Sequence, residues 1–107
     1  ERVFSPLGMH DTGFLPPIER VGRIAPTERC RFLDAWPCKA PDVEPLRGVV
    51  HDPTARRMGG VAGHAGLFST ARDMTRFARM LLGGGALGPR RVLSPLTVAK
   101  MITPATP

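Results

Sequence analysis

The chain has 107 residues, of which 12 are Gly and 12 are Pro, and its formal net charge is +6. This length allows one domain at most, and so many glycines and prolines exclude a coiled coil, a long helical bundle and a multi-domain enzyme. Two interpretations remain: a loop-rich small domain, or a piece of a larger body whose core orders it.

The basic charge is concentrated in the second half of the chain. Residues 1–52 hold seven basic and eight acidic groups, whereas residues 53–107 hold eight basic groups and one acid, Asp73. Such asymmetry is typical of a surface for nucleic acid or anionic membranes, or of one face of a larger body. Aromatic residues are 6%, Tyr is absent, and no nucleic-acid-binding motif occurs. A basic binding module therefore stays the alternative hypothesis.

The two cysteines, Cys30 and Cys38, are too few for a disulfide framework. They can bridge one loop or stay free, and their spacing is not that of a zinc knuckle. No apolar run reaches about 18 residues, so no transmembrane helix is expected. Residues 1–6 carry no apolar signal segment, which leaves the compartment unknown. We expect neither a metal nor a cofactor.

The first half of the chain is expected to be irregular. Residues 1–4 are typical of the tail of a helix, which the segment Ser5-Pro6-Leu7-Gly8-Met9 should break. Residues 10–47 are rich in proline and resemble an excursion over the surface of a larger scaffold, often near a functional site. Short strands are expected at Ile24-Ala25 or Val49-Val50.

A glycine-rich segment spans residues 59–70, with glycines at positions 59, 60, 63 and 66. This density indicates tight turns or a close approach of two backbone segments. The segment is not a phosphate-binding loop, because Leu67 and Phe68 follow the last glycine where such a loop has a Lys and a hydroxyl residue.

The sequence predicts a helix over residues 71–82. Thr70 suits the N-cap with Asp73 three residues on, and Gly83-Gly84-Gly85 suits the C-terminal end. One apolar stripe is expected at the helical spacing i, i+3, i+4 and i+7, formed by Met74, Phe77, Ala78 and Leu81. The arginines at 72, 76 and 79 are expected on the other side, as a solvated or interdomain face.

A second helix is predicted to start at Ser94-Pro95. Ser is a favoured N-cap, and Pro suits the first helical position. Its apolar face is expected to consist of Val98, Met101 and Ile102.

Several segments, taken in order, resemble one family. They are Ser5-Pro6-Leu7-Gly8-Met9-His10-Asp11-Thr12, then Gly48-Val49-Val50-His51-Asp52-Pro53-Thr54-Ala55, then residues 59–74 with Gly66-Leu67-Phe68-Ser69-Thr70-Ala71-Arg72-Asp73-Met74, and finally Leu93-Ser94-Pro95. With them the sequence resembles the beta-lactamase-related serine hydrolases, which include class C beta-lactamases, penicillin-binding DD-peptidases and esterases. The resemblance covers almost the whole chain and implies an α/β parent fold, an antiparallel sheet flanked by helices. This segment would supply mostly loops and helices of the helical subdomain.

The resemblance implies acyl transfer by three motifs: Ser-x-x-Lys, Tyr-x-Asn, and Lys-Thr-Gly or His-x-Gly. The chain departs from this pattern, because it has no Tyr and none of its serines, Ser5, Ser69 and Ser94, is followed by Lys three residues later. His64-Ala65-Gly66 matches His-x-Gly but precedes the helix that the third motif should follow, so we interpret it as a false match. Residues 1–107 are therefore expected to be an interior part of the domain, between the second and third motifs, with no catalytic residue.

The candidate substrate-binding residues are His51, Asp52, His64 and Ala65. By resemblance, the segment before the helix at 71–82 skirts the mouth of the active site, with His64 or Ala65 on its rim. The structural interpretation is that His51 and Asp52 tie loops together, because an Asp before Pro53 readily accepts local backbone N–H groups.

Two further arrangements of these residues have less support from the sequence. A metal site from His51, Asp52 and His64 has suitable ligand types but no tight ligand motif. A Ser-His-Asp triad from Ser69, His64 and Asp52 is conceivable because triads are recognised by geometry, but Ser69 is expected to cap the following helix.

The sequence thus predicts part of a serine hydrolase that acts by acyl-enzyme chemistry on a beta-lactam, a peptidoglycan peptide or an ester. The segment should be inactive alone. Its partners would be the rest of the parent domain and a small-molecule or peptide substrate, with no nucleic acid. The family is often periplasmic, secreted or membrane-anchored in bacteria.

Overall fold

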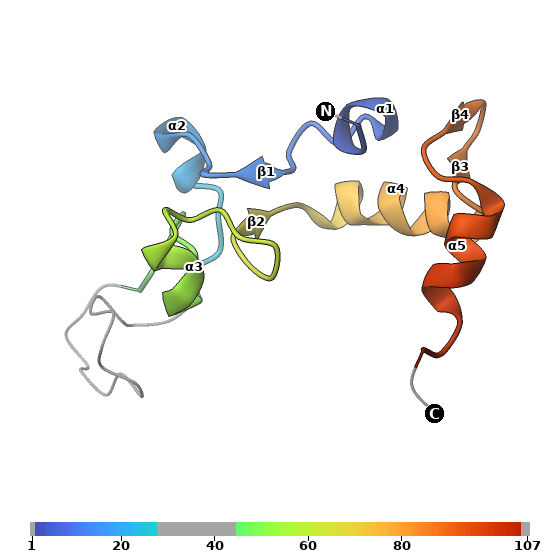
Figure 1. Cartoon of the computed structure of the whole chain (residues 1–107). Helices are drawn as coiled ribbons and strands as arrows, with labels where there is room; N and C mark the ends of the chain where they lie inside the picture. Colours follow the sequence, from blue (N-terminus) through green and yellow to red (C-terminus); the bar gives the residue numbers. More distant parts are fainter. Residues whose placement is uncertain (1, 28–44, 106–107) are drawn as a thin grey trace. The chain divides into compact units, whose positions relative to one another are not determined.

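The computed structural model describes residues 2–27 and 45–105, so Cys30 and Cys38 lie outside the described residues. The chain divides into two compact units, a helical unit and a loop unit (Figure 1). The helical unit comprises residues 1–12 and 69–107, and the loop unit comprises residues 13–68.

The helical unit is built around α4, Ala71–Leu82, whose bounds and caps are those predicted. The Thr70 side chain accepts a hydrogen bond from the backbone N–H of Asp73 at 3.2 Å, which satisfies one of the donors left free in the first turn. Gly83 forms the C-cap, and the chain then turns through Gly84 and Gly85.

The prediction for the start of the chain was wrong. Phe4–Leu7 form a helical turn, α1, so the segment that should break a helix is itself helical. Pro6 is tolerated there because the first N–H groups of a helix have no partner within it. The predicted turn at Gly8 is present: this residue is a left-handed C-cap with φ of 65°.

The buried face of α4 differs from the predicted stripe. Met80 is fully buried and Asp73 is 3% exposed, whereas Met74 is 45% exposed. The face that packs against the rest of the unit is therefore turned by one residue toward Asp73, Arg76, Phe77 and Met80. Arg76, expected in solvent, is half-buried, and its guanidinium donates a hydrogen bond to the carbonyl of Gly8.

The core of the helical unit joins the two ends of its sequence. Leu7, Met9 and Met80 form the buried cluster, and partly buried apolar side chains surround it, namely Val3, Phe4, Phe77, Leu81, Leu87, Val92 and Leu93. Burial of such side chains contributes about 25 cal/mol per Å² of apolar area removed from water, so this cluster stabilises the unit.

An unpredicted hairpin follows α4. Strands β3, Ala86–Leu87, and β4, Arg90–Arg91, pair antiparallel with Ala86 opposite Arg91. The final helix, α5, spans Pro95–Ile102 with Ser94 as its predicted cap, accepting from the N–H of Thr97 at 3.0 Å.

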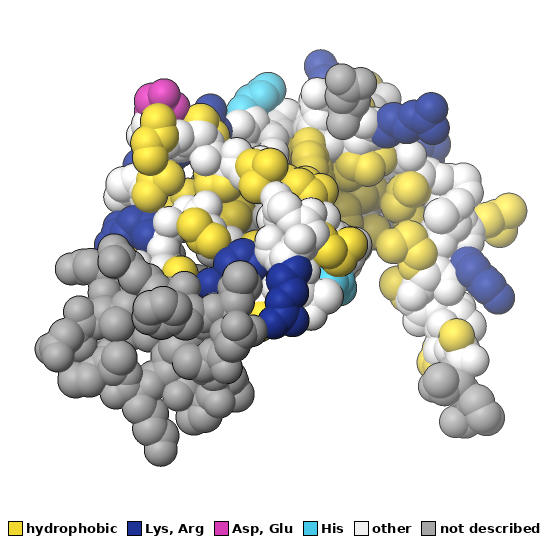
Figure 2. Space-filling view, turned by 60° about the vertical axis from the view of Figure 1, so that its left-hand side comes forward, with side chains coloured by type: hydrophobic (Ala, Val, Ile, Leu, Met, Phe, Trp, Pro, Cys, Tyr) yellow, Lys and Arg dark blue, Asp and Glu magenta, His cyan; other side chains and the backbone are white. Residues whose placement is uncertain are grey.

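The apolar face predicted for α5 is only partly buried. Val98 is 5% exposed, whereas Met101 and Ile102 are 58% and 73% exposed. Hydrophobic side chains are visible on the surface of the unit (Figure 2).

The loop unit contains four short elements among its described residues: β1, Gly13–Phe14; α2, Ile18–Val21; α3, Pro53–Arg57; and β2, Leu67–Phe68. The strands β1 and β2 pair antiparallel, with Gly13 opposite Phe68. The strands expected at 24–25 and 49–50 are absent, because these residues form bends and extended loop with no strand partner. A small cluster of Val50, Ala55 and Ala62 is the core of this unit.

Within the described residues, helices and two-stranded antiparallel sheets alternate with loops, which agrees with the predicted mixture of helices and loops. None of the described helices is long and apolar enough to cross a bilayer.

Candidate functional site

The candidate site begins at Asp52, which caps α3. Its φ of −60° and ψ of 123° are non-helical, and its Oδ1 accepts the backbone N–H of Ala55 at 2.7 Å. Pro53 follows at the first helical position, where its missing N–H costs nothing. The predicted hydrogen bond from a local backbone N–H to the Asp52 side chain is confirmed.

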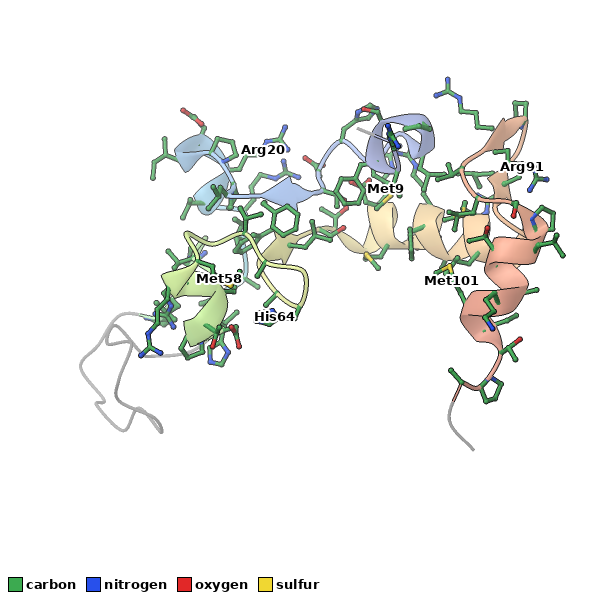
Figure 3. All side chains as sticks on the ribbon, viewed as in Figure 1. Met9, Arg20, Met58, His64, Arg91 and Met101 are labelled. Atoms are coloured by element: carbon green, nitrogen blue, oxygen red, sulfur yellow. The ribbon has the colours of Figure 1, made fainter. Side chains whose placement is uncertain are left out.

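His64 lies on the loop between α3 and β2 (Figure 3). The loop folds back on itself, since the N–H of Ala62 donates to the carbonyl of Ala65 at 3.2 Å. Gly66 has φ of 106°, and a Cβ on it would lie 2.3 Å from the carbonyl oxygen of Gly60. Only glycine allows this approach of the two backbone segments, so the predicted close contact is present.

The side chains of His64 and Asp52, which are 12 residues apart in the sequence, are in contact. His64 Nε2 lies 3.1 Å from Asp52 Oδ1, and the side chains are 54% and 38% exposed. Because a carboxylate can only accept, the proton in this hydrogen bond resides on Nε2. The contact fixes the imidazole ring while leaving it open to solvent.

Hydrogen bonding lowers the pKa of Asp52. The main cause is the backbone N–H of Ala55, followed by the side chain of His64. Asp52 is therefore an anion at neutral pH and holds a donor, which is the usual way in which a carboxylate orients an imidazole.

The other two candidates have structural surroundings. Ala65 is half-buried and packs against the cluster of Val50, Ala55 and Ala62. The carbonyl of His51 accepts a hydrogen bond from Arg56 Nη2 at 2.8 Å, and the residue is half-buried. Both thus stand beside the Asp52–His64 contact and help to hold its loops.

The metal site and the serine triad considered from the sequence involve His64, Asp52 and Ser69. Among the described residues, no group of three or more His, Cys, Asp or Glu side chains could hold a metal ion. Ser69 belongs to the helical unit, and its hydroxyl lies 2.8 Å from that of Thr12. The expectation that Ser69 caps α4 was wrong, because Thr70 takes that position.

Sequence reasoning missed Asp73, the most buried charged residue in the part of the chain that the structure describes. Its Oδ2 accepts the N–H of Asp11 at 2.9 Å and the hydroxyl of Thr12 at 2.8 Å. Its Oδ1 lies 3.8 Å from Arg76 Nη1. One signal in the sequence could have pointed to a special role for Asp73, since it is the only acid of residues 53–107. The sequence analysis assigned Asp73 to the helix cap alone.

Comparison with known proteins accounts for the whole length of the chain. The family model named Beta-lactamase matches residues 1–107. Curated proteins from Salmonella enteritidis, Salmonella gallinarum and Salmonella newport, each named "Putative D-alanyl-D-alanine carboxypeptidase", are 36% identical to it over 108 residues. The match covers 92% of this chain and 24% of each relative, so the chain spans about a quarter of their length. The chain belongs to the beta-lactamase family.

Proposed function

We propose that the chain is part of the catalytic domain of a serine hydrolase that acts through a covalent acyl-enzyme on a peptidoglycan peptide, a beta-lactam or an ester. The observation that carries the proposal is the family match over all 107 residues. The name of the relatives, a carboxypeptidase for D-alanyl-D-alanine, favours a peptide substrate among the three classes.

The proposal places this segment inside an α/β domain, between the second and third catalytic motifs. The nucleophile, its Lys and the Tyr would come from outside these residues. Two of the three serines have structural partners instead: Ser94 caps α5, and Ser69 bonds to Thr12. None of the three serines, Ser5 included, is followed three residues later by the Lys of the Ser-x-x-Lys motif. The 107 residues are therefore expected to be inactive alone.

The segment would contribute a rim to the substrate-binding site. His64 is exposed and oriented by a carboxylate, so its ring can hydrogen-bond a polar group of a passing substrate. Asp52, held by the first turn of α3, would act on the substrate through His64. His51 and Ala65 would support the two loops.

The test compares the 107-residue chain with the longer protein that its coding sequence specifies. Both are assayed with nitrocefin, a p-nitrophenyl ester and a peptide that ends in D-Ala-D-Ala. We expect turnover by the longer protein and none by the chain. Hydrolysis by the chain that disappears in Ser69→Ala, or no turnover of any substrate by the longer protein, would overturn the proposal.

The rim role has its own variant, His64→Ala in the longer protein. Loss of a binding contact that is shared by ground and transition states raises KM and leaves kcat unchanged. One lost hydrogen bond of about 1 kcal/mol corresponds to roughly a fivefold rise in KM. Met58→Ala, a change at another exposed side chain of the loop unit, is the control. An unchanged KM for His64→Ala would remove His64 from the site.

A further inference from the structure

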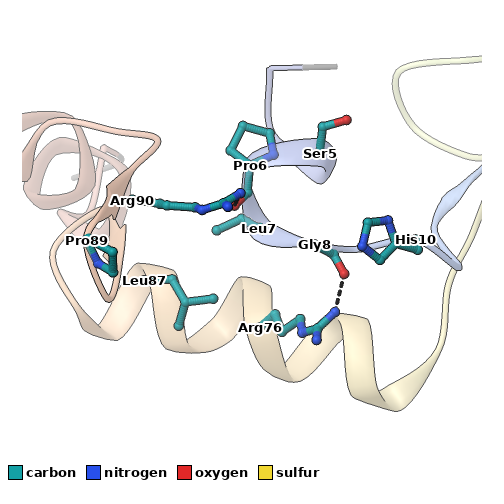
Figure 4. Close-up of a pocket in the computed structure, with 9 residues that line it drawn as sticks. All are labelled: Ser5, Pro6, Leu7, Gly8, His10, Arg76, Leu87, Pro89 and Arg90. Atoms are coloured by element: carbon teal, nitrogen blue, oxygen red, sulfur yellow. Dashed lines mark hydrogen bonds between the residues drawn. The ribbon is translucent and has the colours of Figure 1, made fainter.

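The helical unit contains an open pocket of about 450 Å³ (Figure 4). Its walls come from α1 and the residues after it, from α4, and from the β3–β4 hairpin. The pocket lies entirely within the helical unit and shares no residue with the Asp52–His64 site.

Two guanidinium groups stand in this pocket. Arg76 on α4 donates from Nη1 to the carbonyl of Gly8, and Arg90 on β4 donates from Nη1 to the carbonyl of Pro6 at 3.2 Å. Both arginines are thereby held on carbonyls that lie two residues apart, those of Gly8 and Pro6. Each of these bonds uses one nitrogen, and a guanidinium has five N–H donors in a planar fork, so donors remain for a ligand.

Two further polar side chains of the pocket are able to donate. The hydroxyl of Ser5 and the ring of His10 line it, and none of its lining residues is acidic. The described residues of the helical unit include seven basic side chains but only two acids, Asp11 and Asp73. Arg76 Nη1 lies 3.8 Å from the carboxylate oxygen Oδ1 of Asp73. The hydrogen bond of Arg90 goes instead to an uncharged group, the backbone carbonyl of Pro6.

The remaining wall of the pocket is apolar. Pro6, Leu7, Leu87 and Pro89 contribute it. A pocket that combines a few polar groups with apolar walls suits a small organic molecule better than an inorganic ion.

We propose that this pocket binds a small organic carboxylate, with the carboxylate on the Arg76 and Arg90 guanidiniums and the apolar body against Leu87 and Pro89. Arginine is suited to this role because its planar fork matches the two oxygens of a carboxylate. The proposal does not rest on the hydrolytic function proposed above.

The test is a binding measurement on the full protein that contains the chain, by calorimetry in a phosphate-free buffer of low salt. Benzoate is the probe, and benzamide is its neutral isostere. We expect saturable binding of benzoate with a Kd of about 1 mM or tighter, which is realistic for so small a ligand. Benzamide should bind at least about tenfold more weakly, because it lacks the charge that the guanidiniums recognise.

Two variants locate the site. Arg90→Gln should weaken benzoate binding at least about tenfold, since it removes a charged donor from an exposed side chain without touching the core. Arg79→Gln removes an exposed arginine of α4 that does not line the pocket, and it should leave Kd unchanged.

Each other outcome overturns the proposal. Equal binding of benzoate and benzamide would show that the charge is not recognised. Equal losses in the two variants would show a nonspecific effect of net charge. Inorganic phosphate that competes as well as benzoate would show an ion site with no organic selectivity. None of these readouts depends on hydrolysis, so failure of the proposed function would not be confused with failure of this site.

Discussion

Removal of the Asp73 carboxylate should detach the segment at residues 11–12 from α4. Asp73 is 3% exposed and accepts two hydrogen bonds, from the N–H of Asp11 at 2.9 Å and from the hydroxyl of Thr12 at 2.8 Å. These two bonds connect positions that are about 60 residues apart in the chain. In Asp73→Ala both donors lose their acceptor inside a partly buried site.

The size of the effect follows from the two bonds. A hydrogen bond to a charged group contributes about 1.5–3 kcal/mol, and removal of one partner of a buried charged cluster costs about 3–5 kcal/mol. The hydroxyl of Thr12 keeps a second neighbour, Ser69 Oγ at 2.8 Å, which reduces the loss. We therefore expect Asp73→Ala to lower the free energy of unfolding by about 3 kcal/mol. Asp73→Asn, which keeps one acceptor, should lose about half as much.

The assay is urea unfolding followed by circular dichroism, combined with amide hydrogen exchange at Asp11. The N–H of Asp11 should exchange about a hundredfold faster in Asp73→Ala than in the wild type. Arg79→Ala changes an exposed side chain of the same helix and serves as the control. Its free energy of unfolding should stay within about 0.5 kcal/mol of the wild-type value. Equal exchange rates at Asp11 in the wild type and Asp73→Ala would refute the role assigned to this carboxylate.

Three other changes test the packing and the loop. Met80→Ala should cost about 2–5 kcal/mol in urea unfolding, because Met80 is fully buried; a cost below about 1 kcal/mol would contradict the assigned core. Gly66→Ala places a Cβ 2.3 Å from a backbone carbonyl oxygen at φ of 106° and should cost more than about 1 kcal/mol, whereas Gly63→Ala meets nothing within 4 Å and should cost less. His64→Ala should raise the pKa of Asp52 toward its ordinary value, as followed by NMR titration of the carboxyl carbon. Because the folded-state pKa is lowered, the stabilising contribution of Asp52 is complete above the unfolded-state pKa and is lost as pH falls through the folded-state value. A pKa of Asp52 that is the same with and without His64 would show that their contact is not formed in solution.

Local signals in the sequence were enough to predict the bounds of α4 and the start of α5, the two longest helices among the described residues. The caps Thr70 and Ser94 and the glycines from Gly83 each act within one turn, so their effect is readable without the rest of the fold. The same locality explains the interpretation of Asp52, whose acceptor role involves a donor only three residues away.

Local signals did not predict which face of α4 is buried. Periodicity finds an apolar stripe through Met74, but the buried face is decided by what packs on it, and here that is the segment of Leu7 and Met9. Contacts between distant segments, such as Asp73 with Asp11, have no signature in a single sequence. The contact of His64 with Asp52 is likewise set by the path of a glycine-rich loop rather than by a motif.

The start of the chain shows a different limit. Pro6 was interpreted as a helix breaker, although proline is harmless in the first turn of a helix. The β3–β4 hairpin was missed because its strands have only two residues each, too few for an alternating pattern.

The most direct test of the central proposal is to locate the acyl group on the longer protein that contains this chain. The protein is mixed with each of the three substrate classes and quenched in acid, and the acylated peptide is identified by mass spectrometry. The account predicts an acyl group on a serine outside residues 1–107, within a Ser-x-x-Lys sequence. Acylation of Ser5, Ser69 or Ser94, or turnover with no acylated serine, would contradict it.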